Sequence, residues 1–343
     1  MKKNIMIALL LIISFTIHHA FAEDGTNKTG GFKVKLPDGL YLYQPKIYEE
    51  VFSPLFIVEK GTLVDPYTFA ARIGKDKFIK DYVEGKRFHV YVEGSPAGIL
   101  TDVKFEFVKG CDSGVFLPDI RGKGNYEGKP LKEFYSNKSF YVSDENERSY
   151  GSLKAIAVPV ELARPRTLKS YEVTEVDRII AIDAVRKRFV PEMFDRIKER
   201  LKTLHEEKQV IVGDKRSRLD SINALDFVGN GKKNLIGIYD YTVSYTSAAR
   251  NDDMVAVFPA AILFAVFDNG VERIAAAEGY EPAFSLGGII DIDGAGTPEL
   301  VLQESVTGED EDPDDGRQIT VLEHTTSGWK NIYRSKKICG TIY

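Results

Sequence analysis

A duplicated segment in the last third of the chain limits the possible folds most. Residues 225–236 (LDFVGNGKKNLI) align with residues 290–301 (IDIDGAGTPELV) at an offset of 65. Each copy has a hydrophobic–Asp–hydrophobic triplet, a Gly-x-Gly turn and an apolar strand. A further predicted strand follows each copy, at 262–267 and 319–322, and a polar turn ending in glycine comes after it. A supersecondary unit that recurs in this way indicates stacked β modules.

The second copy resembles the FG-GAP/VCBS-type repeat, the calcium-loop β unit of integrin-α-like propellers. Residues 291–300 (DIDGAGTPEL) carry the resemblance, and the similar region runs from roughly residue 220 to the end of the chain. Two copies do not make a closed propeller, which has about four to eight blades. The resemblance therefore implies the module rather than the complete propeller.

The resemblance also implies a weak calcium site in the second loop. Its ligands are expected to be the carboxylates of Asp291, Asp293 and Glu299 and the backbone carbonyl of Thr297. Ala295 occupies the position of a further Asp or Asn ligand, so we expect an affinity in the weak range of about 10⁻⁴–10⁻³ M. The alternative is that the two Asp side chains only cap backbone amides in a tight glycine turn.

The first copy departs further from the ligand pattern. Its third, seventh and ninth positions are Val228, Lys232 and Asn234, and only Asp226 and Asn230 keep suitable side chains. We expect this loop to be a metal-free turn.

The region before the repeats is predicted to be a small β-rich α+β domain over residues 23–168. Short runs rich in aromatic and β-branched residues, separated by turn residues, extend from about residue 32 to 165. Asp65 followed by Pro66 predicts the start of a helix, and a second short helix is expected at 76–83.

A charged connecting helix is predicted over residues 169–210. Thr174 and Asp177 fit a capping pattern at its start, and Pro191 predicts a kink or a junction of two helices. One apolar face follows at spacings of four and three residues: Val190, Phe194, Ile197, Leu201 and Leu204. Residues 211–343 then form the FG-GAP/VCBS-like β-repeat domain, so the predicted fold class is α+β and β-rich.

The first 22 residues have the pattern of a secretory signal peptide. Lys2 and Lys3 precede an uncharged apolar stretch at 5–17, and an A-x-A cleavage pattern lies at 20–22. The alternative is a membrane anchor, but 13 apolar residues are too short to span ~30 Å of hydrocarbon. We expect an exported protein, periplasmic or extracellular, without a membrane span after cleavage.

Export makes a disulfide between the only two cysteines plausible. Cys111 and Cys339 would close a loop of 228 residues (339 minus 111), which is worth about 5 kcal/mol at most in the chain-entropy model. The alternative is two buried free thiols.

Composition and motifs favour a binding or structural role over catalysis. The 343 residues carry a formal net charge of −5, which argues against nucleic-acid binding. The sequence shows no His pair at metal-ligand spacing, no phosphate-binding loop and no nucleophile elbow. We expect an exported non-enzymatic binding or structural protein whose partner is a protein or glycan surface. The alternative is an exported hydrolase with a site assembled from both domains.

Overall fold

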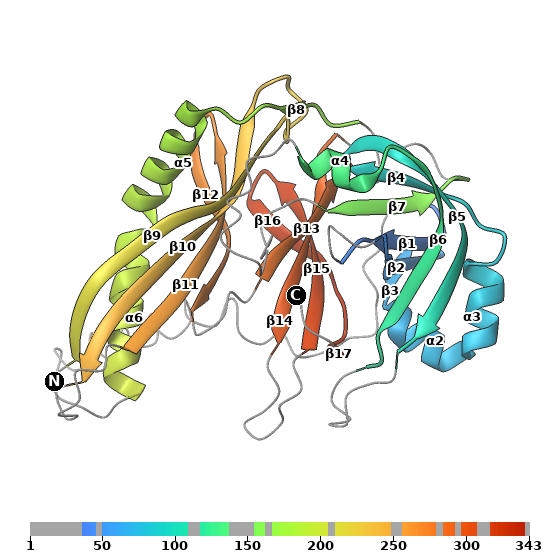
Figure 1. Ribbon diagram of the computed structural model, residues 1–343, viewed down its shortest axis with the longest axis horizontal. Helices are drawn as coiled ribbons and strands as arrows, with labels where there is room; N and C mark the ends of the chain where they lie inside the picture. Colours follow the sequence, from blue (N-terminus) through green and yellow to red (C-terminus); the bar gives the residue numbers. More distant parts are fainter. Residues whose placement is uncertain are drawn as a thin grey trace, which may run out of the picture.

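The computed structural model describes residues 36–45, 50–108, 117–136, 154–161, 167–204, 210–247, 256–278, 284–291, 296–306 and 316–339. The signal peptide, Cys111, Asp293 and Ala295 lie outside the described residues, so the hypotheses that depend on them stay predictions. Figure 1 shows curled antiparallel sheets stacked in layers, with helices at both ends of the stack. The predicted β-rich class is confirmed.

The first layer is a seven-stranded sheet, here called the N-terminal sheet, with the strand order β3-β2-β1-β7-β4-β5-β6. Its strands are β1 (Gly39–Tyr43), β2 (Ser53–Glu59), β3 (Thr62–Val64), β4 (Phe88–Val92), β5 (Ser95–Phe107), β6 (Ile120–Gly128) and β7 (Ala155–Pro159). Helices α2 (Pro66–Ile73) and α3 (Lys75–Tyr82) lie at its outer side, and α4 (Leu131–Ser136) follows β6. The side chain of Asp65 accepts a 2.7 Å hydrogen bond from Thr68 N–H, which confirms the predicted start of α2.

The opposite end of the stack is a five-stranded sheet, here called the helix-covered sheet, with the order β12-β11-β10-β9-β8. Its strands are β8 (Ser170–Tyr171), β9 (Val210–Leu225), β10 (Asn234–Ser247), β11 (Ala256–Phe267) and β12 (Gly270–Glu278). Two helices, α5 (Glu175–Arg188) and α6 (Val190–Leu204), cover its outer face.

The start of α5 and the junction between α5 and α6 lie where the sequence predicts them. Thr174 and Asp177 form a capping box at the start of α5, as the sequence predicts. The two helices meet at Phe189, and Pro191 lies in the first turn of α6, where its missing N–H costs no hydrogen bond. Ile197 and other apolar residues of α6 are buried against the sheet. The predicted junction of two helices near Pro191 is therefore confirmed.

A third sheet, here called the central sheet, lies between the other two (Figure 1). It contains β13 (Phe284–Ile290), β14 (Glu299–Val306), β15 (Gly316–Thr325) and β16 (Gly328–Arg334) in that order, and β17 (Ile338–Cys339) pairs with β15. Successive side chains of a strand point to opposite faces. Val301 therefore joins the core of the N-terminal sheet, whereas Leu300 and Leu302 join the core shared with the helix-covered sheet.

The described parts of the two duplicated segments take corresponding places in their sheets. The first copy begins the antiparallel series β9-β10-β11-β12, and the second begins β13-β14-β15-β16. The loop glycines Gly231 and Gly296 are 65 residues apart and have similar positive φ angles of 81° and 94°. Membership of the FG-GAP family stays a prediction, because this likeness concerns strand order and the conformation of one glycine in each copy.

The central sheet shares one apolar core with strands from the first half of the chain. Lys154 N–H donates a 2.8 Å hydrogen bond to the carbonyl of Gly287 on β13. A Cβ on Gly288 would lie 2.7 Å from the side chain of Ile156, so only glycine lets β13 approach β7 this closely. The domain boundaries at 168 and 211 stay predictions, and apolar contacts run across them.

Candidate functional site

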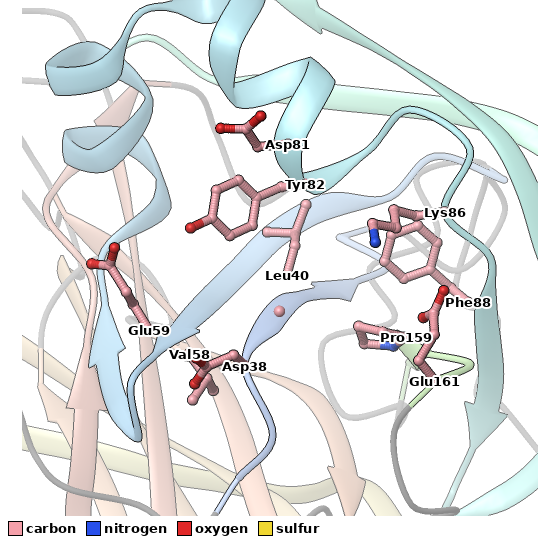
Figure 2. A pocket seen from close by; sticks show the side chains of 11 residues that line it. Asp38, Leu40, Val58, Glu59, Asp81, Tyr82, Lys86, Phe88, Pro159 and Glu161 are labelled. Carbon is pink, nitrogen blue, oxygen red and sulfur yellow. The ribbon is translucent and has the colours of Figure 1, made fainter.

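A pocket of about 300 Å³ lies where β1 and β2 meet the end of α3 (Figure 2). Its size and its mixed apolar and polar lining are typical of sites that bind small ligands or single side chains. Apolar side chains of Leu40, Val58, Phe88 and Pro159 form part of the wall. The remaining lining residues are Asp38, Gly39, Glu59, Asp81, Tyr82, Lys86 and Glu161.

Carboxylates dominate the charge of this pocket. Its lining has four of them and a single ammonium group, that of Lys86. In Figure 2, Lys86 lies on the same side as Glu161, whereas Asp38 and Glu59 lie on the other side. The Asp38–Glu59 side of the pocket is therefore the more negative one.

Partners hold parts of the acidic wall in place. Asp38 Oδ1 accepts a 3.2 Å hydrogen bond from Gly61 N–H. Glu59 Oε2 lies 3.8 Å from a guanidinium nitrogen of Arg72. The side chains are 41% and 63% exposed, so water screens this pair. The two acids therefore keep much of their charge available to a ligand.

Tyr82 shows the effect of these charges. Burial raises the pKa of its hydroxyl, and the nearby carboxylates of Glu59, Asp81 and Asp38 raise it further. Because these carboxylates make the Tyr82 hydroxyl lose its proton less readily, the hydroxyl lies in a negative electrostatic field. The same field attracts a cation.

The structure describes three of the four predicted calcium ligands, Asp291, Thr297 and Glu299. Asp291 is buried at the end of β13, and its Oδ2 accepts a 3.0 Å hydrogen bond from Gly296 N–H. Glu299 starts β14, where it pairs in register with Ile290, and Thr297 lies in the loop just before it. This contact of Asp291 matches the amide-capping alternative. Asp293 lies outside the described ranges, so the full ligand set stays a prediction.

The first loop shows the same capping contact. Asp226 accepts hydrogen bonds from Asn230 N–H at 3.0 Å and from Gly231 N–H at 2.8 Å. Gly231 stands 65 residues before Gly296, so equivalent carboxylates hold equivalent glycine amides in the two copies. Within the described ranges, no three His, Cys, Asp or Glu side chains gather closely enough to hold a metal ion.

The predicted disulfide has one end in the described part of the chain. Cys339 lies on β17, and its N–H donates a 2.9 Å hydrogen bond to the carbonyl of Leu117. Leu117 is six residues after Cys111. Cys111 itself lies outside the described residues, so the bond stays a prediction.

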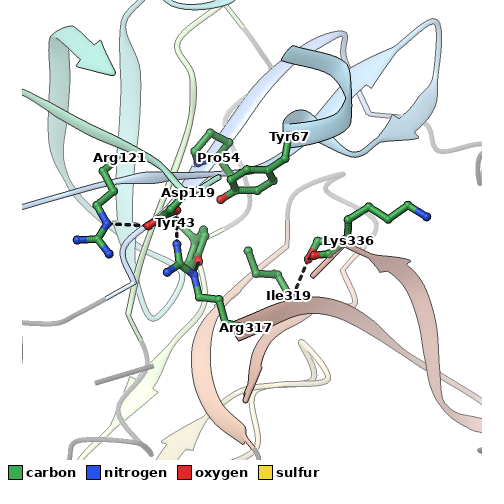
Figure 3. A network of polar contacts seen from close by, with 9 residues as sticks. Tyr43, Pro54, Tyr67, Asp119, Arg121, Arg317, Ile319 and Lys336 are labelled. Carbon is green, nitrogen blue, oxygen red and sulfur yellow. Dashed lines mark hydrogen bonds and ion pairs between the residues drawn. The ribbon is translucent and has the colours of Figure 1, made fainter. Parts of the chain in front are cut away.

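A buried polar network that no sequence motif predicts lies between the N-terminal and central sheets (Figure 3). The guanidinium of Arg317 on β15 donates hydrogen bonds to Asp119 Oδ1 and, at 3.3 Å, to the hydroxyl of Tyr43. Arg121 donates a 2.6 Å hydrogen bond to the other oxygen of Asp119. The only sequence signal is that Arg317 stands two residues before the strand predicted at 319–322, and this signal does not identify the partner.

Two neighbouring carboxylates, those of Asp220 and Asp240, lie on the helix-covered sheet. Arg218 Nε donates a 3.1 Å hydrogen bond to Asp240, and a guanidinium nitrogen of Arg218 lies 3.6 Å from Asp220. Burial raises the pKa of Asp220 to about 6, and the charge of Asp240 adds to this effect. Arg218 therefore offsets two carboxylates at once.

Comparisons with protein-family models, with curated proteins and with solved structures find no match to this chain. In the parts of the chain that the structure describes, no helix combines the length and the apolar character needed to cross a membrane.

Proposed function

We propose that this chain is an exported, non-enzymatic binding protein and that the pocket beside α3 receives a basic side chain of a partner protein. The observation that carries the proposal is the excess of carboxylates around a pocket with apolar walls. The stem of a lysine or arginine packs on apolar surface while its charged end pairs with acids. A neutral glycan offers no charge for these acids, so a protein partner fits better.

The test uses isothermal titration with a capped pentapeptide that contains one central lysine. The matched control peptide has norleucine in place of this lysine, which keeps the stem and removes the charge. We expect the lysine peptide to bind more tightly to the wild type. A variant with Asp38→Asn and Glu59→Gln keeps the shape of the pocket and should bind the lysine peptide about five- to tenfold more weakly, because the attraction between charges is lost.

The control variant is Asp76→Asn, which removes an exposed acid of α3 outside the pocket lining. It should bind the lysine peptide like the wild type. Equal binding of the two peptides, or unchanged binding by the pocket variant, contradicts the proposed function.

We further propose that the second repeat loop belongs to an FG-GAP-like module and binds calcium weakly through Asp291, Asp293, Thr297 and Glu299. The equivalent positions of Asp226 and Asp291 support the module. The carboxylate of Asp291 keeps the calcium proposal open, because a carboxylate that caps an amide still has lone pairs for a cation.

The binding role is preferred to the alternative, an exported hydrolase. Ser285 Oγ lies 3.2 Å from Lys154 Nζ, a distance that would suit a nucleophile and its base. Both side chains are buried, however, and Ser285 has 0% exposure, so this conformation offers no path for a substrate carbonyl. The raised pKa of Asp220 is the other feature that favours catalysis, and Arg218 already occupies that carboxylate.

A further inference from the structure

Lys154 lies at the contact between the N-terminal and central sheets. It precedes β7, and its N–H donates to the Gly287 carbonyl on β13. Its ammonium nitrogen donates a 3.2 Å hydrogen bond to Ser285 Oγ, also on β13. Only 3% of Lys154 is exposed. One residue therefore joins β7 to β13 through its backbone and through its side chain.

The surroundings of Lys154 disfavour a charge. No carboxylate of the described residues forms an ion pair with its amine, and the charge that acts on its pKa is that of Arg317 on β15. Arg317 donates its own hydrogen bonds to Asp119 and Tyr43. Burial lowers the pKa of Lys154 to about 7, and the positive charge of Arg317 contributes to the shift. A neutral amine still donates to Ser285, whereas a protonated amine lies buried without a counter-charge.

We propose that Lys154 is a proton-sensitive latch between β7 and β13, closed while its amine is neutral and loosened when the amine takes up a proton. Opening the contact returns the amine to water, where it binds a proton more readily than in the closed contact. The open state therefore gains stability as the pH falls from about 10.5 towards 7. Below pH 7 the amine is protonated in both states, and the opening equilibrium no longer changes with pH.

Hydrogen exchange measured by mass spectrometry tests the latch on the full exported chain. The readout is the opening constant of peptides from β13, obtained by dividing each exchange rate by its intrinsic rate at the same pH. Between pH 7.5 and 9.5 this constant should fall about tenfold per pH unit in the wild type, because opening is coupled to one proton. Peptides from β11, in the helix-covered sheet, should show a much smaller change.

Two variants of Lys154 separate the latch from a purely structural role. Lys154→Met removes the titrating group, and Lys154→Gln removes it while keeping a donor for Ser285. In both, the opening constant of β13 should be independent of pH. Lys104→Met removes an exposed lysine of β5 and should keep the wild-type dependence. A wild type without pH dependence, or a Lys154 variant that retains it, overturns the proposal.

Discussion

Loss of Arg317 should destabilise the whole fold. Its side chain and that of Asp119 are each only 2% exposed, and they join sheets that come from opposite ends of the chain. Arg317→Met removes the guanidinium and leaves the Asp119 carboxylate buried, with Arg121 as its remaining ionic partner. Removing one member of a buried pair costs about 3–5 kcal/mol, because the other charge stays out of water.

Urea unfolding followed by circular dichroism measures this cost. Asp119→Asn should be destabilising by a similar amount. The double variant Arg317→Met/Asp119→Asn should cost about 2 kcal/mol less than the sum of the single variants, because it leaves no uncompensated carboxylate. This difference from the sum shows that Arg317 and Asp119 interact directly, because two independent losses of packing would have additive effects on the free energy of unfolding.

An exposed ion pair on the same sheet provides the matched control. Arg334 lies 2.6 Å from Glu304, but 53% of the Arg334 side chain is exposed. Arg334→Met should therefore cost less than about 1 kcal/mol. If Arg317→Met costs no more than Arg334→Met, or if the double variant is strictly additive, the buried pair does not hold the two sheets together.

Two further predictions concern residues outside the described ranges. Calorimetric titration should show Ca²⁺ binding at about 10⁻⁴–10⁻³ M that Asp293→Ala abolishes and Asp268→Ala, a change in an exposed turn, leaves intact; flat isotherms for the wild type would rule out the site. Peptide mapping without reductant should yield a linked peptide that contains Cys111 and Cys339 and separates when the sample is reduced. Recovery of the two cysteines only on separate peptides would contradict the disulfide.

Local features of the fold were predictable, because their causes lie within a few residues of sequence. The capping box at Thr174, the helix start at Asp65 and the helix junction at Pro191 each depend on neighbouring backbone groups. The repeated Asp and Gly pattern likewise corresponds to the contacts of Asp226 with Gly231 N–H and of Asp291 with Gly296 N–H. These signals act over three to five residues, which is the range of caps and turns.

The partners of distant strands were not predictable in the same way. Alternation in β14 shows that the strand has two apolar faces, but it does not say which sheet each face meets. Arg317 and Asp119 are 198 residues apart in sequence, and no local pattern connects them. The pocket also combines β1, β2, α3 and the residues around β7. Such a site depends on the topology of the sheet.

The position of the central sheet sets the order in which this protein can complete its fold. Its strands come after those of both flanking sheets in the sequence, yet they fill the middle of the stack. Until residue 284 and those after it emerge from the ribosome, each of the two flanking sheets has an uncovered apolar face. The nascent chain is therefore prone to aggregation until the central sheet has formed. A premature stop codon before residue 284 would remove the layer that covers both flanking sheets.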